Sequence, residues 1–164
     1  MFVQLYKSLV RPHLEYASVI WSPMYIKDKR AIENIQRRST KRVPSLKDKP
    51  YQERLRLLGL PTLEYRRERA DMLQVYKILN NMENLEKDKL FTLCEYGATR
   101  GHSKKLFKKT CKKQKTPNYF SNRVVLNWNS LPECVVSAPS VNSFKDRLNK
   151  HWRNQPLKFE PSFN

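Results

Sequence analysis

PTLEYRRERADMLQVYKILNN, residues 61–81, is the stretch that decides the expected fold. Its apolar residues recur at the spacing of an α-helix, so they form a stripe along one face. The stripe consists of Tyr65, Met72, Leu73, Tyr76 and Leu79. Thr62 can accept hydrogen bonds from the free amides of the first turn, and Glu64 suits the positive end of the helix dipole. We therefore expect a core helix whose opposite face meets solvent.

Similar patterns divide most of the remaining chain into helices. Proline, glycine and capping residues mark the ends of these patterns. The expected helices span residues 1–11, 14–21, 27–43, 51–58, 116–131 and 139–152. In the helix over 27–43, Ile32 and Ile35 are expected to face inward. The predicted fold class is therefore mainly α, a helical bundle of about six to seven helices.

The segment RGHSKKLFKKTCKKQK, residues 100–115, is the most basic part of the chain. It contains eight basic residues and no acidic one. Its lysine pairs recur every four residues, which would spread charge over about half of a helix surface. Phe107 and Thr110, and the lack of a helical apolar stripe, favour extended structure slightly. We expect a small basic β-hairpin or extended arm near 100–115.

The charge of the chain predicts an anionic partner. Its 164 residues include 33 Lys and Arg against 15 Asp and Glu, a net charge of +18. Residues 1–60 carry +8 and residues 100–115 carry +8, while the stretch between them is nearly neutral. Two basic zones on separate elements are typical of the sides of a groove, and the usual partners are nucleic acid or an anionic membrane face.

A membrane is the less favoured of these partners. No apolar run approaches the roughly 20 residues of a spanning helix. The first ten residues, MFVQLYKSLV, contain Gln4 and Lys7 and lack the apolar core of a signal peptide. We expect an intracellular protein, nuclear or cytoplasmic and not secreted.

The residue patterns of common catalytic and metal sites are missing from the sequence. The three cysteines form no CxxC pair, and the three histidines complete no zinc spacing. The aspartates are isolated, and three glycines provide no phosphate-binding loop. His13 with Glu15 is a weak base-and-orienter pair, and His102 is a candidate for touching a phosphate, but a surface histidine is the favoured interpretation of His13. We expect no catalytic residue, no metal site and no cofactor.

Five runs of sequence, in order between residues 5 and 152, resemble one family. They are LYKSLVRPHLEYASVIWSP at 5–23, IENIQRRSTKRVP at 32–44, YQERLRLLGLPTLEYRRERADMLQVYKILN at 51–80, TRGHSKKL at 99–106 and FSNRVVLNWNSLPECVVSAPSVNSFKDRLNKHW at 120–152. Together they resemble the region downstream of the polymerase core in jockey-type non-LTR retrotransposon reverse transcriptases, which are RNA-directed DNA polymerases. Part of that region resembles a polymerase thumb with a C-terminal extension, whose helices hold the template–primer duplex.

The resemblance implies a fragment that lacks the fingers, the palm and the endonuclease. In the family, the fingers and palm lie upstream of the position of Leu5, and the metal-binding aspartates of polymerisation lie there too. The chain also starts inside an apolar helical pattern with no capping residue before it, so we expect the edge of something longer. The expected parts are a thumb-like helical bundle over 1–81, an acidic loop and basic arm over 82–115, C-terminal helices over 116–152 and a frayed tail over 153–164.

The expected function is non-catalytic holding of nucleic acid through its phosphates. RNA, DNA or an RNA–DNA hybrid would be the partner, and the missing polymerase core would be a second one. The candidate nucleic-acid-binding residues are Arg37, Arg38, Lys41, Arg42, Arg66, Arg67, Arg69, Arg100, Lys104, Lys105, Lys108 and Lys109. Five aromatic residues could stack on bases, but their helical spacing favours core packing. They are Trp21, Tyr65, Tyr76, Trp128 and Trp152.

Two alternatives remain open. The first is a protein-interaction module that docks on a missing polymerase core or another partner through the apolar face of its first helices, which carries Phe2, Leu5, Tyr6 and Leu9. The second is a small active enzyme, against which the lack of any visible general base argues.

Overall fold

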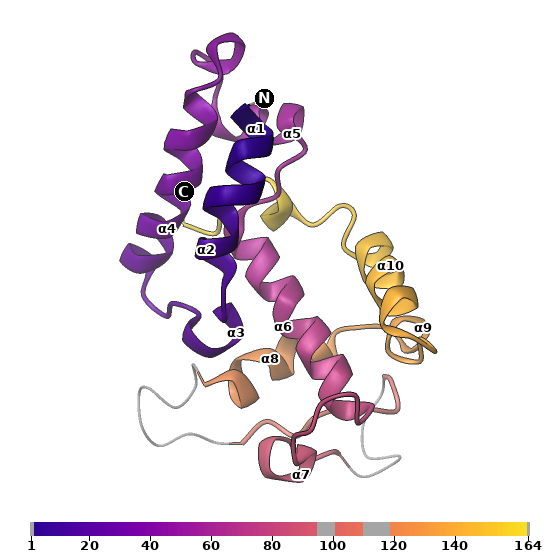
Figure 1. Ribbon diagram of the computed structural model, residues 1–164. Coiled ribbons are helices and arrows are strands. Elements are labelled where there is room, and N and C mark those ends of the chain that lie inside the picture. The colour runs from indigo at the N-terminus through magenta and orange to yellow at the C-terminus, as the bar shows by residue number, and fades with distance from the viewer. Residues whose placement is uncertain (1, 95–100, 110–118, 164) are drawn as a thin grey trace. The chain divides into compact units, whose positions relative to one another are not determined.

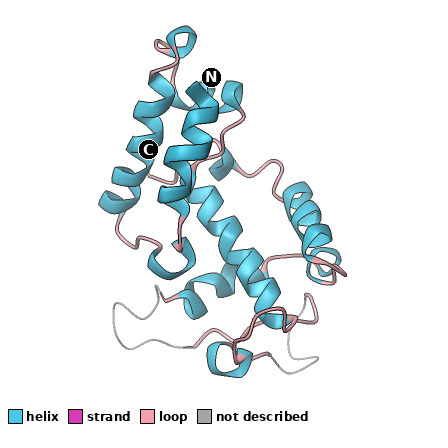
Figure 2. Ribbon diagram, viewed as in Figure 1, coloured by secondary structure: helices cyan, strands magenta, loops and turns pink. Residues whose placement is uncertain are grey.

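The computed structural model describes residues 2–94, 101–109 and 119–163 (Figure 1). Helices dominate these residues, which confirms the mainly α fold class (Figure 2). The chain divides into two compact units, each described separately below. Unit 1 comprises Met1–Glu68 and Asn154–Asn164, and unit 2 comprises Arg69–Arg153. The division falls inside helix α6 (Leu63–Leu79), whereas the first boundary was expected after residue 81.

Unit 1 consists of short helical segments around one long helix, α4. The elements before α6 are α1 (Phe2–Leu5), the π-helical η1 (Tyr6–Val10), α2 (Arg11–Glu15), α3 (Ser18–Trp21), α4 (Ile26–Lys41), the 3-10 turn η2 (Pro44–Leu46) and α5 (Tyr51–Leu58). Proline and glycine set several of the boundaries. Pro12 lies in the first turn of α2, where no backbone donor is needed. Gly59 ends α5 with φ +59°, the left-handed conformation that glycine adopts without strain.

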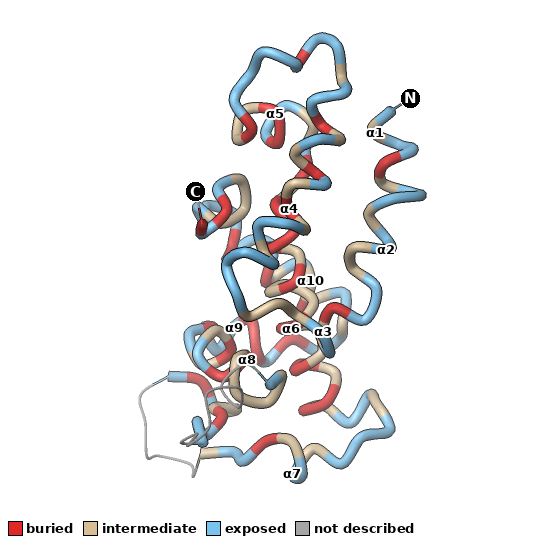
Figure 3. Tube along the Cα trace, turned by 90° about the vertical axis from the view of Figure 1, so that its left-hand side faces the viewer, coloured by how far each residue is buried: buried red, intermediate tan, exposed pale blue. Residues whose placement is uncertain are grey.

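The core of unit 1 combines an apolar cluster with buried polar residues of α4. Tyr6, Tyr51, Leu55 and Leu60 form the apolar cluster, and α4 packs against α5 (Figure 3). The inward-facing residues of α4 are not those expected. Ile35 is 40% exposed, while Glu33 and Gln36 are buried. The prediction for Ile35 was therefore wrong, because α4 buries a face that makes hydrogen bonds.

Residues 154–163 pack on the rest of unit 1, although a frayed tail was expected over 153–164. The 3-10 turn η4 (Pro156–Lys158) lies beside the start of α6, where the Thr62 hydroxyl donates to the Leu157 carbonyl at 2.7 Å. The same hydroxyl accepts from the Tyr65 amide at 3.1 Å, so the predicted cap of this helix is confirmed. Further along, the Ser162 amide and hydroxyl donate to the Glu64 carboxylate at 2.8–3.1 Å. These tertiary contacts hold the tail.

Unit 2 surrounds the remainder of α6 with short helices. They are α7 (Lys87–Leu90), α8 (Phe120–Asn129), α9 (Glu133–Val136) and α10 (Val141–His151). Tyr76 and Phe144 stack with ring centroids 4.3 Å apart, and Trp128 lies 6.0 Å from Phe144. The Tyr76 hydroxyl donates to the Ala138 carbonyl at 2.6 Å. Tyr76 and Trp128 thus belong to the core of unit 2, where Trp152 is buried as well. In unit 1, Tyr65 is buried, whereas Trp21 is exposed.

The described part of the basic segment, residues 101–109, is anchored to unit 2. Leu106 forms an isolated antiparallel bridge with Leu93, so the extended pairing joins 92–94 to 105–107 instead of lying within 100–115. Leu106 is buried, and its amide and carbonyl bond to the Asn129 side chain at 2.9 and 2.8 Å. The Trp128 indole donates to the Lys104 carbonyl at 2.8 Å. Of the two expected forms, a β-hairpin or an extended arm, the hairpin is not found within 101–109: residues 105–107 are extended, pair with 92–94, and bury Leu106. Residues 100 and 110–115 lie outside the described part of the chain.

Candidate functional site

Unit 1 contains an open pocket of about 760 Å³ whose lining is strongly basic. It lies between the C-terminal half of α4, the segment after η2 and the start of α5. We call it the basic pocket. Six of its lining side chains are Lys or Arg and one is acidic. The lining residues are Asn34, Arg37, Arg38, Lys41, Lys47, Asp48, Lys49, Pro50 and Arg54.

Local sequence signals bring these residues together. Arg37, Arg38 and Lys41 lie on one side of α4, because residues three or four apart share a helix face. Pro44 stops the helix after Arg42, and Pro50 precedes the first turn of α5 with extended backbone. The six residues from Pro44 to Lys49 therefore turn the chain back and add their lysines to the arginines of α4.

Tyr51 forms the platform of the basic pocket. Its buried hydroxyl donates to Glu33 Oε1 at 2.6 Å and accepts from Gln36 Nε2 at 3.1 Å, so the ring is fixed. The guanidinium carbon of Arg37 lies 4.8 Å from the ring centroid, and that of Arg54 lies 5.6 Å from it. Two guanidinium groups thus share one aromatic ring, an arrangement stabilised by cation–π attraction and opposed by their like charges.

Burial raises the pKa of both titratable groups in this network, Tyr51 and Glu33. Burial raises the pKa of Tyr51 above its usual range, and the charge of Glu33 adds to this effect. Burial also raises the pKa of the Glu33 carboxyl, while the hydrogen bonds from Tyr51 and from the Leu63 amide (3.0 Å) act in the opposite direction. Tyr51 therefore remains a neutral phenol and a hydrogen-bond donor at neutral pH.

Three cationic residues of the lining, Lys47, Lys49 and Arg54, are absent from the predicted set, and Arg54 is the buried one among them. Its side chain is 4% exposed, and within the described residues its Nε and Nη1 have no hydrogen-bond partner. Burial, and to a smaller degree the charge of Arg37, lower the pKa of Arg54. The sequence contains one signal for this position: Arg54 follows Tyr51 by three residues and precedes Leu58 by four, so it falls on the buried face of α5.

The predicted binding residues of unit 1 divide into two groups. Arg37, Arg38 and Lys41 line the basic pocket, while Arg42 is exposed at the end of α4 and is not part of the lining. Arg66 and Arg67 interact with acidic residues of unit 1 and do not line the basic pocket. Arg66 forms an ion pair with Glu15, Nη2 to Oε2 at 2.8 Å, and Arg67 is buried near Glu33, whose pKa its charge lowers.

The remaining predicted residues belong to unit 2 or lie outside the described residues. Arg69 Nε donates to Asn149 Oδ1 at 2.8 Å, and Lys104 Nζ donates to Asn80 Oδ1 at 2.7 Å. Lys105 is partly buried, and Arg100 lies outside the described part of the chain. Lys108 and Lys109 are exposed. Each basic zone is thus placed within its own unit.

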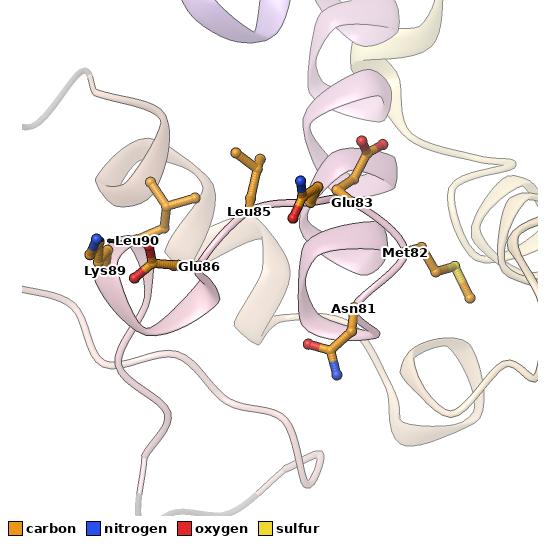
Figure 4. Close-up of a pocket in the computed structure, with 8 residues that line it drawn as sticks. Asn81, Met82, Glu83, Leu85, Glu86, Lys89 and Leu90 are labelled. Atoms are coloured by element: carbon orange, nitrogen blue, oxygen red, sulfur yellow. Dashed lines mark hydrogen bonds and ion pairs between the residues drawn. The ribbon is translucent and has the colours of Figure 1, made fainter.

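A second hollow, of about 940 Å³, lies in unit 2 around the turn that joins α6 to α7 (Figure 4). Its carboxylates are neutralised locally. Glu83 pairs with Lys77 at 2.9 Å, and Glu86 pairs with Lys89 at 2.8 Å, where Figure 4 shows the two side chains close together. No sign of charge dominates there, so this hollow indicates no particular ligand.

Two further searches of the described residues gave no site. No three His, Cys, Asp or Glu side chains in ranges 2–94, 101–109 and 119–163 come together as metal ligands would. None of the helices in those ranges combines the length and the apolar character that crossing a bilayer requires.

No family model, curated protein or solved structure matches the chain. The resemblance to reverse transcriptases therefore depends on the five sequence runs quoted above. The geometry and charge of the basic pocket provide the independent guide to function.

Proposed function

We propose that this chain binds nucleic acid through its phosphates, as the non-catalytic template–primer-holding part of a jockey-type retrotransposon reverse transcriptase. The observation that carries the proposal is the basic pocket, with six cationic side chains and one acidic side chain in its lining. In this proposal the chain contributes no catalytic residue, and polymerisation takes place on a separate polymerase core.

The proposed mechanism is electrostatic. Lysine and arginine side chains neutralise phosphates and release condensed counterions, which gives affinity without reading sequence. A part that holds a moving duplex requires this property, because the bases that it covers change at every step. Arg37 and Arg38 supply planar donors for phosphate oxygens, and Lys41 supplies a point charge.

The salt dependence of binding tests this proposal. We expect the affinity for a labelled RNA–DNA hybrid or DNA duplex to fall steeply with salt, with a slope of log K against log[salt] of about −4.5 for five phosphates. Replacing Arg37, Arg38, Lys41 and Arg42 together by Gln should reduce the size of this slope by about 3.6 if each contacts one phosphate.

A control variant separates the pocket from net charge. Replacing Lys27, Lys87, Lys150 and Arg153 by Gln removes the same number of charges elsewhere. This change should alter the slope by less than about 1. Equal effects of the two variants would show that general charge, and not the pocket, determines binding. A flat salt response of the unaltered chain would refute the proposal.

A second candidate function is docking on a protein partner. It is favoured by exposed apolar side chains on the first helical segments of unit 1, namely Phe2, Leu5, Leu9 and Val10. Under this alternative, Leu5→Glu with Leu9→Glu would abolish capture of a polymerase core, and the four Gln substitutions in α4 and at its end would not. If the four Gln substitutions abolish nucleic-acid binding and the two Glu substitutions do not, the nucleic-acid-binding proposal is favoured.

A further inference from the structure

Arg54 is a buried cation for which the described protein supplies no acceptor at two of its nitrogens. Its Nε and Nη1 have less than 1 Å² of exposed surface each and no hydrogen-bond partner among the described residues. No carboxylate of the described residues bonds to these two nitrogens, including Asp48 in the lining of the same pocket. Glu33 accepts from Tyr51 and from the Leu63 amide, and Glu53 pairs with Lys49. A buried guanidinium without acceptors is strongly unfavourable, so an external anion is the natural partner.

The chemistry of the pocket indicates what this anion is. A guanidinium presents its donors in a fixed fork that matches two oxygens of a phosphate group. Arg37 lies over the same Tyr51 ring, so a second guanidinium is placed beside the first. With six basic side chains against Asp48 in the lining, the pocket favours an anion of more than one charge.

The depth of Arg54 distinguishes between two kinds of phosphate. Because the side chain is 4% exposed, only a narrow group that projects from its carrier reaches the guanidinium. A phosphodiester inside a strand carries a sugar on both sides and is held back by them. A terminal phosphate monoester has one ester bond and three free oxygens, carries up to two negative charges, and can enter end-on.

We propose that Arg54 and Arg37 hold the terminal phosphate monoester of a nucleic-acid strand. Lys41 and Lys47, in the lining of the same pocket, then face the phosphates that follow. This assignment rests on the proposed function for the identity of the carrier, since free phosphate offers the same chemistry.

The test compares oligonucleotides that differ only at one end. Strands of one sequence with a 5′-phosphate, a 3′-phosphate or only hydroxyl ends are titrated with the full chain at fixed salt, and binding is followed by fluorescence anisotropy. One charge-assisted bidentate contact corresponds to a preference of roughly tenfold for a phosphorylated end. Equal binding of all three strands would overturn the inference and leave the proposed function in place.

Variants on α5 assign the preference to Arg54. Arg54→Gln should reduce the preference to less than about twofold, and Arg54→Lys, which keeps the charge and loses the fork, should reduce it partly. The matched control is Arg56→Gln on the same helix, because Arg56 pairs with Glu160 and is not part of the pocket lining. It should keep the full preference. Loss of the preference in Arg56→Gln, with native circular dichroism in every variant, would also overturn the assignment.

Inorganic phosphate and pyrophosphate separate this inference from the proposed function. If the chain binds no oligonucleotide at any salt concentration, the proposed function fails. Phosphate binding by Arg54 is then supported if either ion raises the unfolding midpoint of the unaltered chain and of Arg56→Gln, but not of Arg54→Gln. If neither ion raises the midpoint of the unaltered chain, phosphate binding by Arg54 is refuted as well.

Discussion

Replacing Arg54 by Met should make the protein more stable in phosphate-free buffer. Methionine resembles arginine in length and helix propensity. Removing a buried charge that has no hydrogen-bond acceptor should raise the free energy of unfolding by about 2 kcal/mol. The change also removes the cation–π contact with Tyr51 at 5.6 Å, which contributes about 0.5–1 kcal/mol. The expected net gain is about 1 kcal/mol, or about 2–4 °C in the unfolding midpoint for a chain of this size.

Added phosphate should reverse this order. A ligand at 100 times its dissociation constant stabilises the folded state by about 2.7 kcal/mol, so the unaltered chain should overtake the Met variant. Scanning calorimetry with and without phosphate measures both effects. The control is Arg56→Met, which removes the exposed pair with Glu160, worth about 0–1 kcal/mol, and a cation–π contact with Phe159 at 6.0 Å that resembles the one Arg54 makes with Tyr51. If Arg54→Met lowers stability by about 1 kcal/mol or more without phosphate, while the control does not, Arg54 is satisfied within the fold and the reasoning fails.

Three further changes address the interior of the two units. Tyr51→Phe removes the donor to Glu33 and the acceptor for Gln36, so urea unfolding should show a loss of about 2–3 kcal/mol; a loss below about 0.5 kcal/mol would contradict the network. Because burial raises the pKa of Glu33 above 4.5, its contribution to stability is present below pH 4.5 and is lost as pH rises through the folded pKa. Glu33→Gln has no titrating carboxyl, so this pH-dependent contribution should be missing from its free energy of unfolding. If the free energy of unfolding depends on pH identically in Glu33→Gln and in the unaltered chain, the expected pKa shift of Glu33 is refuted. Asp71→Asn breaks the ion pair with Arg123, 2.9 Å long and mostly buried, and should cost about 3 kcal/mol in unit 2; calorimetry that finds an unchanged midpoint would exclude that role.

The sequence predicted the features that depend on local signals. The Thr62 cap and the left-handed Gly59 at the end of α5 both follow from short-range backbone chemistry, and both are present. The cluster of Arg37 with Lys41 was also visible, because helical spacing alone places these residues on one side of α4.

Features that depend on distant partners could not be predicted from the pattern. Ile35 was expected to face inward but is exposed, whereas Glu33 is buried. Periodicity assigns burial by polarity and contains no information on the Tyr51 hydroxyl and the Leu63 amide, which bond to the Glu33 carboxylate in the fold. Arg54 was overlooked for the same reason. A charged residue in a short amphipathic helix such as α5 is normally exposed to solvent. The burial of Arg54 becomes apparent only in the folded structure, where α4 packs against α5.

The contacts of residues 154–163 with the start of α6 determine the order in which the protein can be completed on the ribosome. Unit 2 consists of one continuous stretch of chain, so all of its partners have been synthesised once Arg153 has been added. Unit 1 contains the earlier residues, yet Glu64 must wait for Ser162, which is translated 98 positions later. Of the two units, unit 1 begins to be synthesised earlier but is completed later. A ribosome that stops shortly before Ser162 therefore releases a chain in which unit 2 has all its contacts and unit 1 does not.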